Sequence, residues 1–63
     1  MNVQDIVVDG VYKCTDGKTR YVRAIVGTPK LEIPFYVCFQ EGFNIPDIAS
    51  ITYFALWAEE RLR

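Results

Sequence analysis

The residues best suited to chemistry are basic and aromatic side chains that follow one another along a predicted hairpin. They are Tyr12, Lys13, Lys18, Arg20, Tyr21 and Arg23. Arginine and lysine bind carboxylates or phosphates, and tyrosine rings pack on apolar groups or stack on bases. Tyr36, on a later strand, and Phe43, in a Gly-Phe-Asn loop, complete the predicted contact surface. The chemistry that these residue types favour is noncovalent binding.

The chain has few of the residues that enzymes use for catalysis. The chain has no histidine, which excludes Ser-His and Cys-His pairs. Among eight carboxylates only Glu59 and Glu60 are adjacent, and neighbours on a helix point about 100° apart, so they do not converge. No glycine-rich phosphate-binding motif is present. We therefore predict a protein that is not an enzyme, with no catalytic residues and no cofactor.

The two cysteines, Cys14 and Cys38, are expected to remain reduced. The predicted strands place a third strand between them, which gives a separation of roughly 9–10 Å across a flat sheet. A disulfide requires less than about 7 Å between Cα atoms, although barrel curvature could shorten the gap. Without histidine or a CxxC pair, no metal site is expected. Free thiols are typical of a cytosolic protein.

Length and composition indicate one small domain that spans residues 1–63. The chain is 51% hydrophobic and 14% aromatic, which is enough to form a thin core. Its net charge of −1 disfavours nucleic acid as the partner, because phosphate binding needs a clustered positive surplus. No apolar run reaches transmembrane length and the first residues do not resemble a secretory signal. We therefore expect a cytoplasmic protein.

The elements that must position these residues are short β-strands followed by one helix. Strands are predicted over residues 6–14, 20–26 and 33–39, with a bend at Asp9-Gly10 and a short fourth strand over residues 48–51. Thr52 is the expected helix N-cap, with Ile51 and Leu56 as a hydrophobic staple. The apolar stripe that follows consists of Phe54, Trp57, Ala58 and Leu62.

The Asp16-Gly17 pair predicts a hairpin with a two-residue type I′ turn. The resulting cross-strand pairs are Thr15 with Lys18, Lys13 with Arg20, Tyr12 with Tyr21, and Val11 with Val22. Lys13 opposite Arg20 would require a compensating anion. This anion is either a carboxylate of the chain, such as Glu32 or Glu41, or an acidic ligand. The predicted core is Val11, Val22, Ile25, Val37 and Phe39, which requires a bulge at Arg23-Ala24.

These motifs together resemble a broad group of small SH3-like proteins common in bacteriophages and prophages. The resemblance rests on Gly10-Val11-Tyr12, the Asp16-Gly17 hairpin with Arg20-Tyr21-Val22 and Ile25, Tyr36-Val37, and the closing Phe54-Ala55-Leu56-Trp57-Ala58. It implies an SH3-like small barrel of four or five short antiparallel strands with a C-terminal helix, acting by binding. The alternative fold is a three-stranded sheet with a helix packed across it.

The predicted function is that of a small phage or mobile-element module that contacts a host or viral protein and occupies a site on it, in the bacterial host cytoplasm. The predicted contact residues are Tyr12, Lys13, Arg20, Tyr21, Arg23, Tyr36 and Phe43. Two alternatives remain open. One is a nucleic-acid-binding module that uses the same hairpin, and the other is a structural homodimer.

Overall fold

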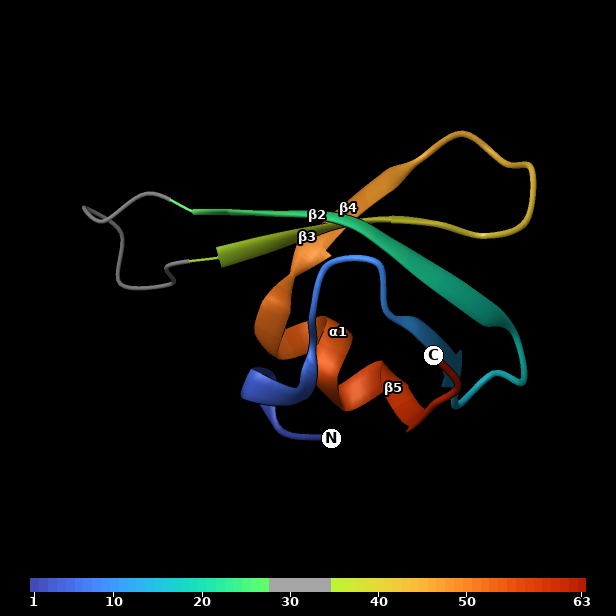
Figure 1. Ribbon diagram of the computed structural model, residues 1–63, viewed down its shortest axis with the longest axis horizontal. Helices are drawn as coiled ribbons and strands as arrows, with labels where there is room; N and C mark the ends of the chain where they lie inside the picture. Colours follow the sequence, from blue (N-terminus) through green and yellow to red (C-terminus); the bar gives the residue numbers. More distant parts are fainter. Residues whose placement is uncertain (28–34) are drawn as a thin grey trace.

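The described residues form one open antiparallel sheet of five strands, with one short α-helix packed beneath it (Figure 1). The computed structural model describes residues 1–27 and 35–63. The elements are the 3-10 helix η1 (Val3–Asp5), β1 (Val11–Cys14), β2 (Thr19–Gly27), β3 (Phe35–Gln40), β4 (Asp47–Ser50), α1 (Ile51–Trp57) and β5 (Ala58–Arg61). The mainly β class with one C-terminal helix is thus confirmed.

The strands lie in the order β4-β3-β2-β1-β5, and each neighbouring pair is antiparallel. Strands β4 and β5 are the two edges of this sheet, so the described strands do not close into a barrel. The alternative of three strands is wrong in strand number. Helix α1 follows β4 directly and leads directly into β5, so it carries the chain from one edge of the sheet to the other.

Several predicted boundaries change. The first strand begins at Val11 instead of residue 6, because a turn closed by the Gly10 N–H and the Val7 carbonyl precedes it. Asp9 adopts a φ of 69° in this turn, which confirms the predicted bend. The turn predicted over residues 27–30 and the start of the third strand at residues 33–34 lie wholly or partly outside the described residues. So does Glu32, one of the two carboxylates considered as the hairpin anion.

The predicted register of the hairpin is wrong by one residue. Tyr12 pairs with Arg20, Val11 with Tyr21 and Lys13 with Thr19. The Cys14 N–H donates to the Lys18 carbonyl at 2.9 Å, so three residues form the loop instead of two. Gly17, with a φ of 81°, is the third of them, as in a type I turn followed by a left-handed residue. The Asp-Gly pair therefore marks the position of the turn correctly. The number of residues in the loop, however, decides which residues of the two strands face each other.

The one-residue shift places Tyr12 and Cys14 on the inner face of the sheet, together with Arg20 and Val22 of the neighbouring strand. The predicted bulge is confirmed, because the pairing of β2 with β3 shifts between Val22 and Ala24. Val22, Val37 and Phe39 are buried as predicted, and Ile25 packs against them. Val11 is the exception: it is only half-buried, because the register turns it away from the core.

Tyr12 and Phe54 form the centre of the core, and both are fully buried. Their rings meet edge to face with centroids 5.7 Å apart, and the Phe39 ring lies 5.5 Å from that of Phe54. The Tyr12 hydroxyl donates to the Asp5 carbonyl at 2.7 Å and accepts from the Val7 N–H at 2.9 Å. A buried tyrosine hydroxyl requires such partners. These bonds tie the segment before β1 to the core.

Helix α1 begins and ends earlier than predicted. Ser50, and not Thr52, is the N-cap, and its hydroxyl accepts from the Tyr53 N–H at 3.2 Å. Ile51 is consequently a buried helical residue, whereas Leu56 is 76% exposed, so the predicted staple does not form. The helix ends at Trp57, and the next residues form β5, which pairs with β1. Leu62 therefore does not belong to the helical stripe.

The arrangement of the two cysteines follows the prediction. Cys14 lies on β1 and Cys38 on β3, with β2 between them, and both thiols are free. Cys14 is buried, whereas Cys38 is half-buried on the opposite face of the sheet.

Candidate interaction surface

The structure divides the predicted contact residues between the two faces of the sheet. Tyr12 and Arg20 are 0% and 4% exposed and lie on the inner face. Including them in a contact surface is therefore a mistake, and for Tyr12 it follows from the shifted register. The residues that remain accessible are Lys13, Tyr21, Arg23, Tyr36 and Phe43.

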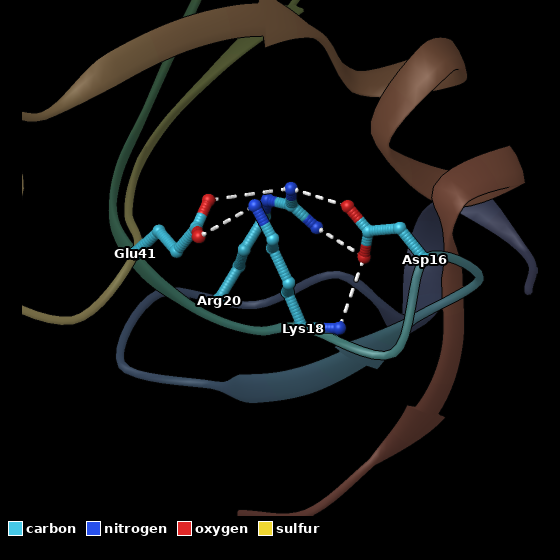
Figure 2. Close-up of polar contacts among 4 residues, drawn as sticks. All are labelled: Asp16, Lys18, Arg20 and Glu41. Carbon is cyan, nitrogen blue, oxygen red and sulfur yellow. Dashed lines mark hydrogen bonds and ion pairs between the residues drawn. The ribbon is translucent and has the colours of Figure 1, made fainter.

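The buried Arg20 guanidinium contacts three segments of the chain. It makes two parallel bonds to the Asp16 carboxylate (Figure 2), at 2.7 and 3.0 Å. A third contact, of 3.4 Å, reaches Glu41 after β3. Its planar group also lies 3.7 Å from the ring centroid of Trp57 at the end of α1. The carboxylates of the chain itself therefore neutralise this charge; Glu41 was one predicted partner and Asp16 was not.

The ion pair shifts the titration of both partners. The hydrogen bond from Arg20, together with the one from the Lys18 backbone N–H, lowers the pKa of Asp16 to about 2. In return, the hydrogen bond to Asp16 raises the pKa of Arg20 above its usual range. The Arg20 Nε has no hydrogen-bond partner among the described residues. Both charges are therefore permanent near neutral pH, and the pair is a structural element rather than an acid–base group.

The loop between β3 and β4 is held at both ends. Glu41 is bound by Arg20 and by the Lys18 ammonium, the latter at 3.3 Å. The Asn44 N–H donates to the Glu41 carbonyl, and the Asn44 carbonyl accepts from the Gln40 amide, each at 3.0 Å. The Gln40 amide oxygen accepts in turn from Arg23 at 2.6 Å. Six residues from two strands and two loops thus fix the path of this segment.

The same loop displays two large apolar side chains to solvent. Phe43 is 105% exposed and Ile45 is 89% exposed, the two highest values for large apolar residues in the described chain. Gly42 precedes them with a φ of 55°, which turns the backbone outward. The predicted exposure of Phe43 is confirmed. The sequence analysis did not single out Ile45. Its position two residues after Phe43 in the same predicted loop could have indicated that it is exposed as well.

The outer face of β2, β3 and β4 carries a continuous apolar patch, which we name the outer-face patch. Its members are Ala24, Val26, Tyr36, Cys38 and Ile48. Ala24 and Ile48 flank Cys38 on the two neighbouring strands, and Val26 lies opposite Tyr36. Val26 and Ile48 are 50% and 57% exposed. Of this patch only Tyr36 was predicted to make a contact.

The half of the outer face formed by β1 and β5 is polar by contrast. Lys13 lies opposite Glu60 of β5 and Thr19 of β2. Beside them, the Tyr21 hydroxyl donates to the Asp9 carboxylate at 2.9 Å, and this bond raises the pKa of Tyr21. The two halves of one face therefore differ in chemical character, although Arg23, Gln40 and Ser50 place some polar groups on the half that carries the outer-face patch.

A shallow cleft of about 160 Å³ lies between Thr15, Tyr53, Leu56 and Trp57. It is smaller than the 300–1,000 Å³ typical of small-molecule sites. The described residues contain no cluster of acidic, cysteine or histidine side chains that could hold a metal ion. None of the helices in residues 1–27 and 35–63 has the length and apolar character needed to cross a bilayer.

Comparisons with protein-family models, curated proteins and solved structures found no match to this chain. The functional assignment therefore rests on the geometry of its surfaces.

Proposed function

We propose that this chain is a small non-enzymatic binding module that contacts a protein partner through its β3–β4 loop. The observation that supports the proposal most directly is the pair Phe43 and Ile45, almost fully exposed on a loop that is fixed at both ends. These two side chains would be the central apolar anchors of the contact.

Two physical arguments support this reading. Large apolar side chains that cluster on a surface are characteristic of interaction sites, and aromatic residues carry a large share of binding energy when a partner buries them. A loop that already has its bound conformation also loses little entropy on binding. The bonds of Glu41 and Gln40 to the loop provide that order before any partner arrives.

Polar and aromatic residues beside the loop would form the rim of the contact. Tyr21 lies opposite Gln40 at the loop's base, and Arg23 reaches the Gln40 side chain. Both are exposed, as is Lys13 on the neighbouring strand. Of the residues predicted from sequence, Phe43 is thus the centre of the proposed site, and Tyr21, Arg23 and Lys13 are its edge.

We further propose that the module is of the small SH3-like type found in bacteriophages, and that it occupies a site on a host or viral protein in the bacterial cytoplasm. The resemblance of its hairpin and helix motifs to that group supports this assignment, and five short antiparallel strands are consistent with it. The alternative of nucleic-acid binding has less support, because Lys18 and Arg20 already bind carboxylates and Tyr12 is interior.

The proposal is tested by affinity capture from bacterial lysate, run with and without nuclease treatment, with the wild-type chain and two variants as baits. In the first variant, Phe43→Ser is combined with Ile45→Ser; in the matched control, Leu56→Ser changes an exposed apolar residue on α1. Mass spectrometry identifies the bound proteins. We expect a specific protein that is retained by wild type and by the control but lost with the double variant. Its affinity should fall about 30-fold or more, as for a hot spot.

Two outcomes would contradict the proposal. Capture that is equal for wild type and the double variant would place the contact outside the loop. Capture that disappears after nuclease treatment would instead support the nucleic-acid alternative, in which case affinity should also fall steeply with salt. The thermal midpoint of each bait is measured first, and little change is expected because these side chains make few contacts.

A further inference from the structure

Helix α1 is apolar on its outer side as well as on the side that faces the core. None of its residues is charged, and Ile51, Phe54 and Ala55 are buried. Tyr53 and Leu56, on the outer side, are 59% and 76% exposed. A surface helix normally carries charged and polar residues on its outer side, whereas a helix that is apolar all round is normally buried. The outer side of α1 therefore has the composition of a surface that another molecule covers.

The cleft on this side of α1 has the size of one aromatic ring. It lies between Thr15, Tyr53, Leu56 and Trp57 and has a volume of about 160 Å³. An apolar cavity of about 150 Å³ holds one benzene molecule. The Tyr53 and Trp57 rings stand edge to face, with centroids 5.6 Å apart, so an entering ring can continue the edge-to-face packing that aromatic rings favour. The cleft therefore fits a single aromatic side chain.

The walls of the cleft are held in place by the chain itself. The Thr15 N–H donates to the Trp57 carbonyl at 2.9 Å. The Trp57 ring contacts the Arg20 guanidinium, 3.7 Å from its centroid, and meets the Phe39 ring edge to face at 5.6 Å. A site whose walls are already ordered loses little entropy when a side chain enters it.

Phe43 is the aromatic side chain that this cleft can receive. At 105% it has the highest exposure of the aromatic residues in the described chain, and the next, Tyr53, lines the cleft itself. At this exposure the Phe43 ring stands clear of its own chain, and bonds of Glu41 and Gln40 fix the loop that carries it. The ring is therefore directed to another molecule and does not fill the cleft of its own chain.

We infer that the cleft beside Trp57 receives the Phe43 ring of a second copy of this chain. The inference rests on the proposed function, because it uses the same loop as an anchor, and it names a partner for that loop. Two different surfaces meet in such a contact, so every copy carries both halves of it. Arg20 supports both halves, since it binds Glu41 at the start of the loop and packs on Trp57 at the cleft.

The first test is sedimentation equilibrium of the full chain over a wide concentration range. We expect the average mass to rise above 7.3 kDa as the concentration increases. Phe43→Ser, which removes the ring, and Leu56→Lys, which places a charge at the cleft, should each raise the dissociation constant about 30-fold or more. The matched control is Val26→Lys, at an exposed apolar position on β2, which should leave association unchanged. Thermal midpoints are measured first, and little change is expected at these exposed positions.

The second test mixes the two variants that are defective alone. Phe43→Ser keeps the cleft but lacks the ring, whereas Leu56→Lys keeps the ring but has an altered cleft. An equimolar mixture can form one intact contact, so it should associate more tightly than either variant by itself. Trp57 is the single tryptophan of the chain and lines the cleft, so its fluorescence emission should change on mixing.

Three outcomes would overturn the inference. One is a chain that stays monomeric up to millimolar concentration. Another is association that persists in Phe43→Ser, as expected if α1 of one copy packed on α1 of the other. The third is a mixture that associates no better than its components. A monomeric chain that nevertheless loses its captured lysate protein with the double loop variant would exclude the second copy alone and leave the proposed function standing.

Discussion

Arg20 shows how one buried charge can organise a small domain. Its guanidinium contacts the hairpin loop at Asp16, the β3–β4 loop at Glu41 and the helix at Trp57. Removing a charge from water is costly unless fixed partners replace the lost hydration. The two carboxylates and the indole ring are those partners, and they come from three separate parts of the sequence. Beside Trp57, the edge of the core is therefore covered by an ion pair as well as by apolar side chains.

The depressed pKa of Asp16 gives a prediction about acid stability. This pKa is about 2 in the folded chain against 3.8 for an unperturbed aspartate. Between these values the unfolded chain binds more protons, so the contribution of Asp16 to folding is complete above about pH 4 and is lost as the pH falls toward 2. We expect the thermal midpoint of wild type to exceed that of Asp16→Asn at pH 6, and the difference to shrink between pH 4 and pH 2.

Thermal denaturation of wild type and of Asp16→Asn, followed by circular dichroism at several pH values, tests this prediction. Other carboxylates titrate in the same range, but they are common to both chains and largely cancel in the difference. A gap between wild type and Asp16→Asn that stays constant from pH 6 to pH 2 would refute a role for the Asp16 charge.

At this scale, the sequence predicts one partner of the hairpin charges better than it predicts where the hairpin side chains point. Glu41 is correctly considered as a counterion, because it binds both Lys18 and Arg20. The face on which Tyr12 lies depends, however, on whether the turn has two residues or three. Asp16-Gly17 fits both, because each turn needs a glycine with positive φ near its end. One extra loop residue moves Tyr12 to the face of Val22, whereas Arg20 shares that face in either register.

Among the elements, the start of α1 allows a direct comparison between two neighbouring hydroxyl residues. Ser50 caps the helix through the Tyr53 N–H, whereas Thr52 is an exposed residue of the first turn. Loss of an N-cap typically costs about 1 kcal/mol. We expect Ser50→Ala to lower the free energy of unfolding by about 1 kcal/mol, and Thr52→Ala to change it by less than about 0.5 kcal/mol.

Urea denaturation of the two variants measures these changes. The result that would contradict the assignment is the reverse order, with Thr52→Ala the more destabilising of the two. Such an order would restore the cap position predicted from sequence.

The end of α1 was harder to predict than its start. Ala58, Glu59 and Glu60 are all compatible with a helix, so local preference alone continues the helix past Trp57. The backbone instead becomes extended at Ala58, and these residues pair with β1. The reason is nonlocal: β1 has β2 on one side only, and its other edge needs a partner for its backbone groups. A sequence window cannot contain that information, because the partner lies more than forty residues away.

For the whole molecule, the order of the strands makes β5 essential. Among the described strands it is the only neighbour of β1 apart from β2, and Ala58 at its start is 2% exposed. The Leu62 N–H also donates to the Val11 carbonyl at 2.7 Å. We expect a chain that stops after Trp57 to lose its cooperative thermal transition, because β1 would keep one neighbour and the core would be open on that side.

The matched control stops after Arg61 and so keeps all of β5. This shorter deletion should retain a cooperative transition at a lower midpoint, as judged by circular dichroism and by the dispersion of amide signals in proton NMR. If both deletions melt alike, β5 does not have the role that the topology assigns to it.

The class of the fold was within reach of the sequence, because the short alternating strands and the closing apolar helix are strong local patterns. That the sheet stays open could not be predicted from the sequence. Closure of a sheet depends on how far each strand twists and on where α1 ends and β5 begins. The outer-face patch was also missed. Its members are spread over three strands, and the bulge between Val22 and Ala24 decides which of them share a face.

In the β3–β4 loop, the residues that fix the backbone are different from the residues that are exposed to solvent. This division has a consequence for how such a chain can diversify. Glu41, Gln40 and Asn44 fix the backbone, whereas Phe43 and Ile45 are displayed without contributing to that support. If the loop makes the contact proposed above, substitution at the two displayed positions alone would exchange one recognition specificity for another on an unchanged framework. Related chains could thus acquire new targets by single steps, and the same two positions are the natural ones to randomise in a library that uses this domain as a scaffold.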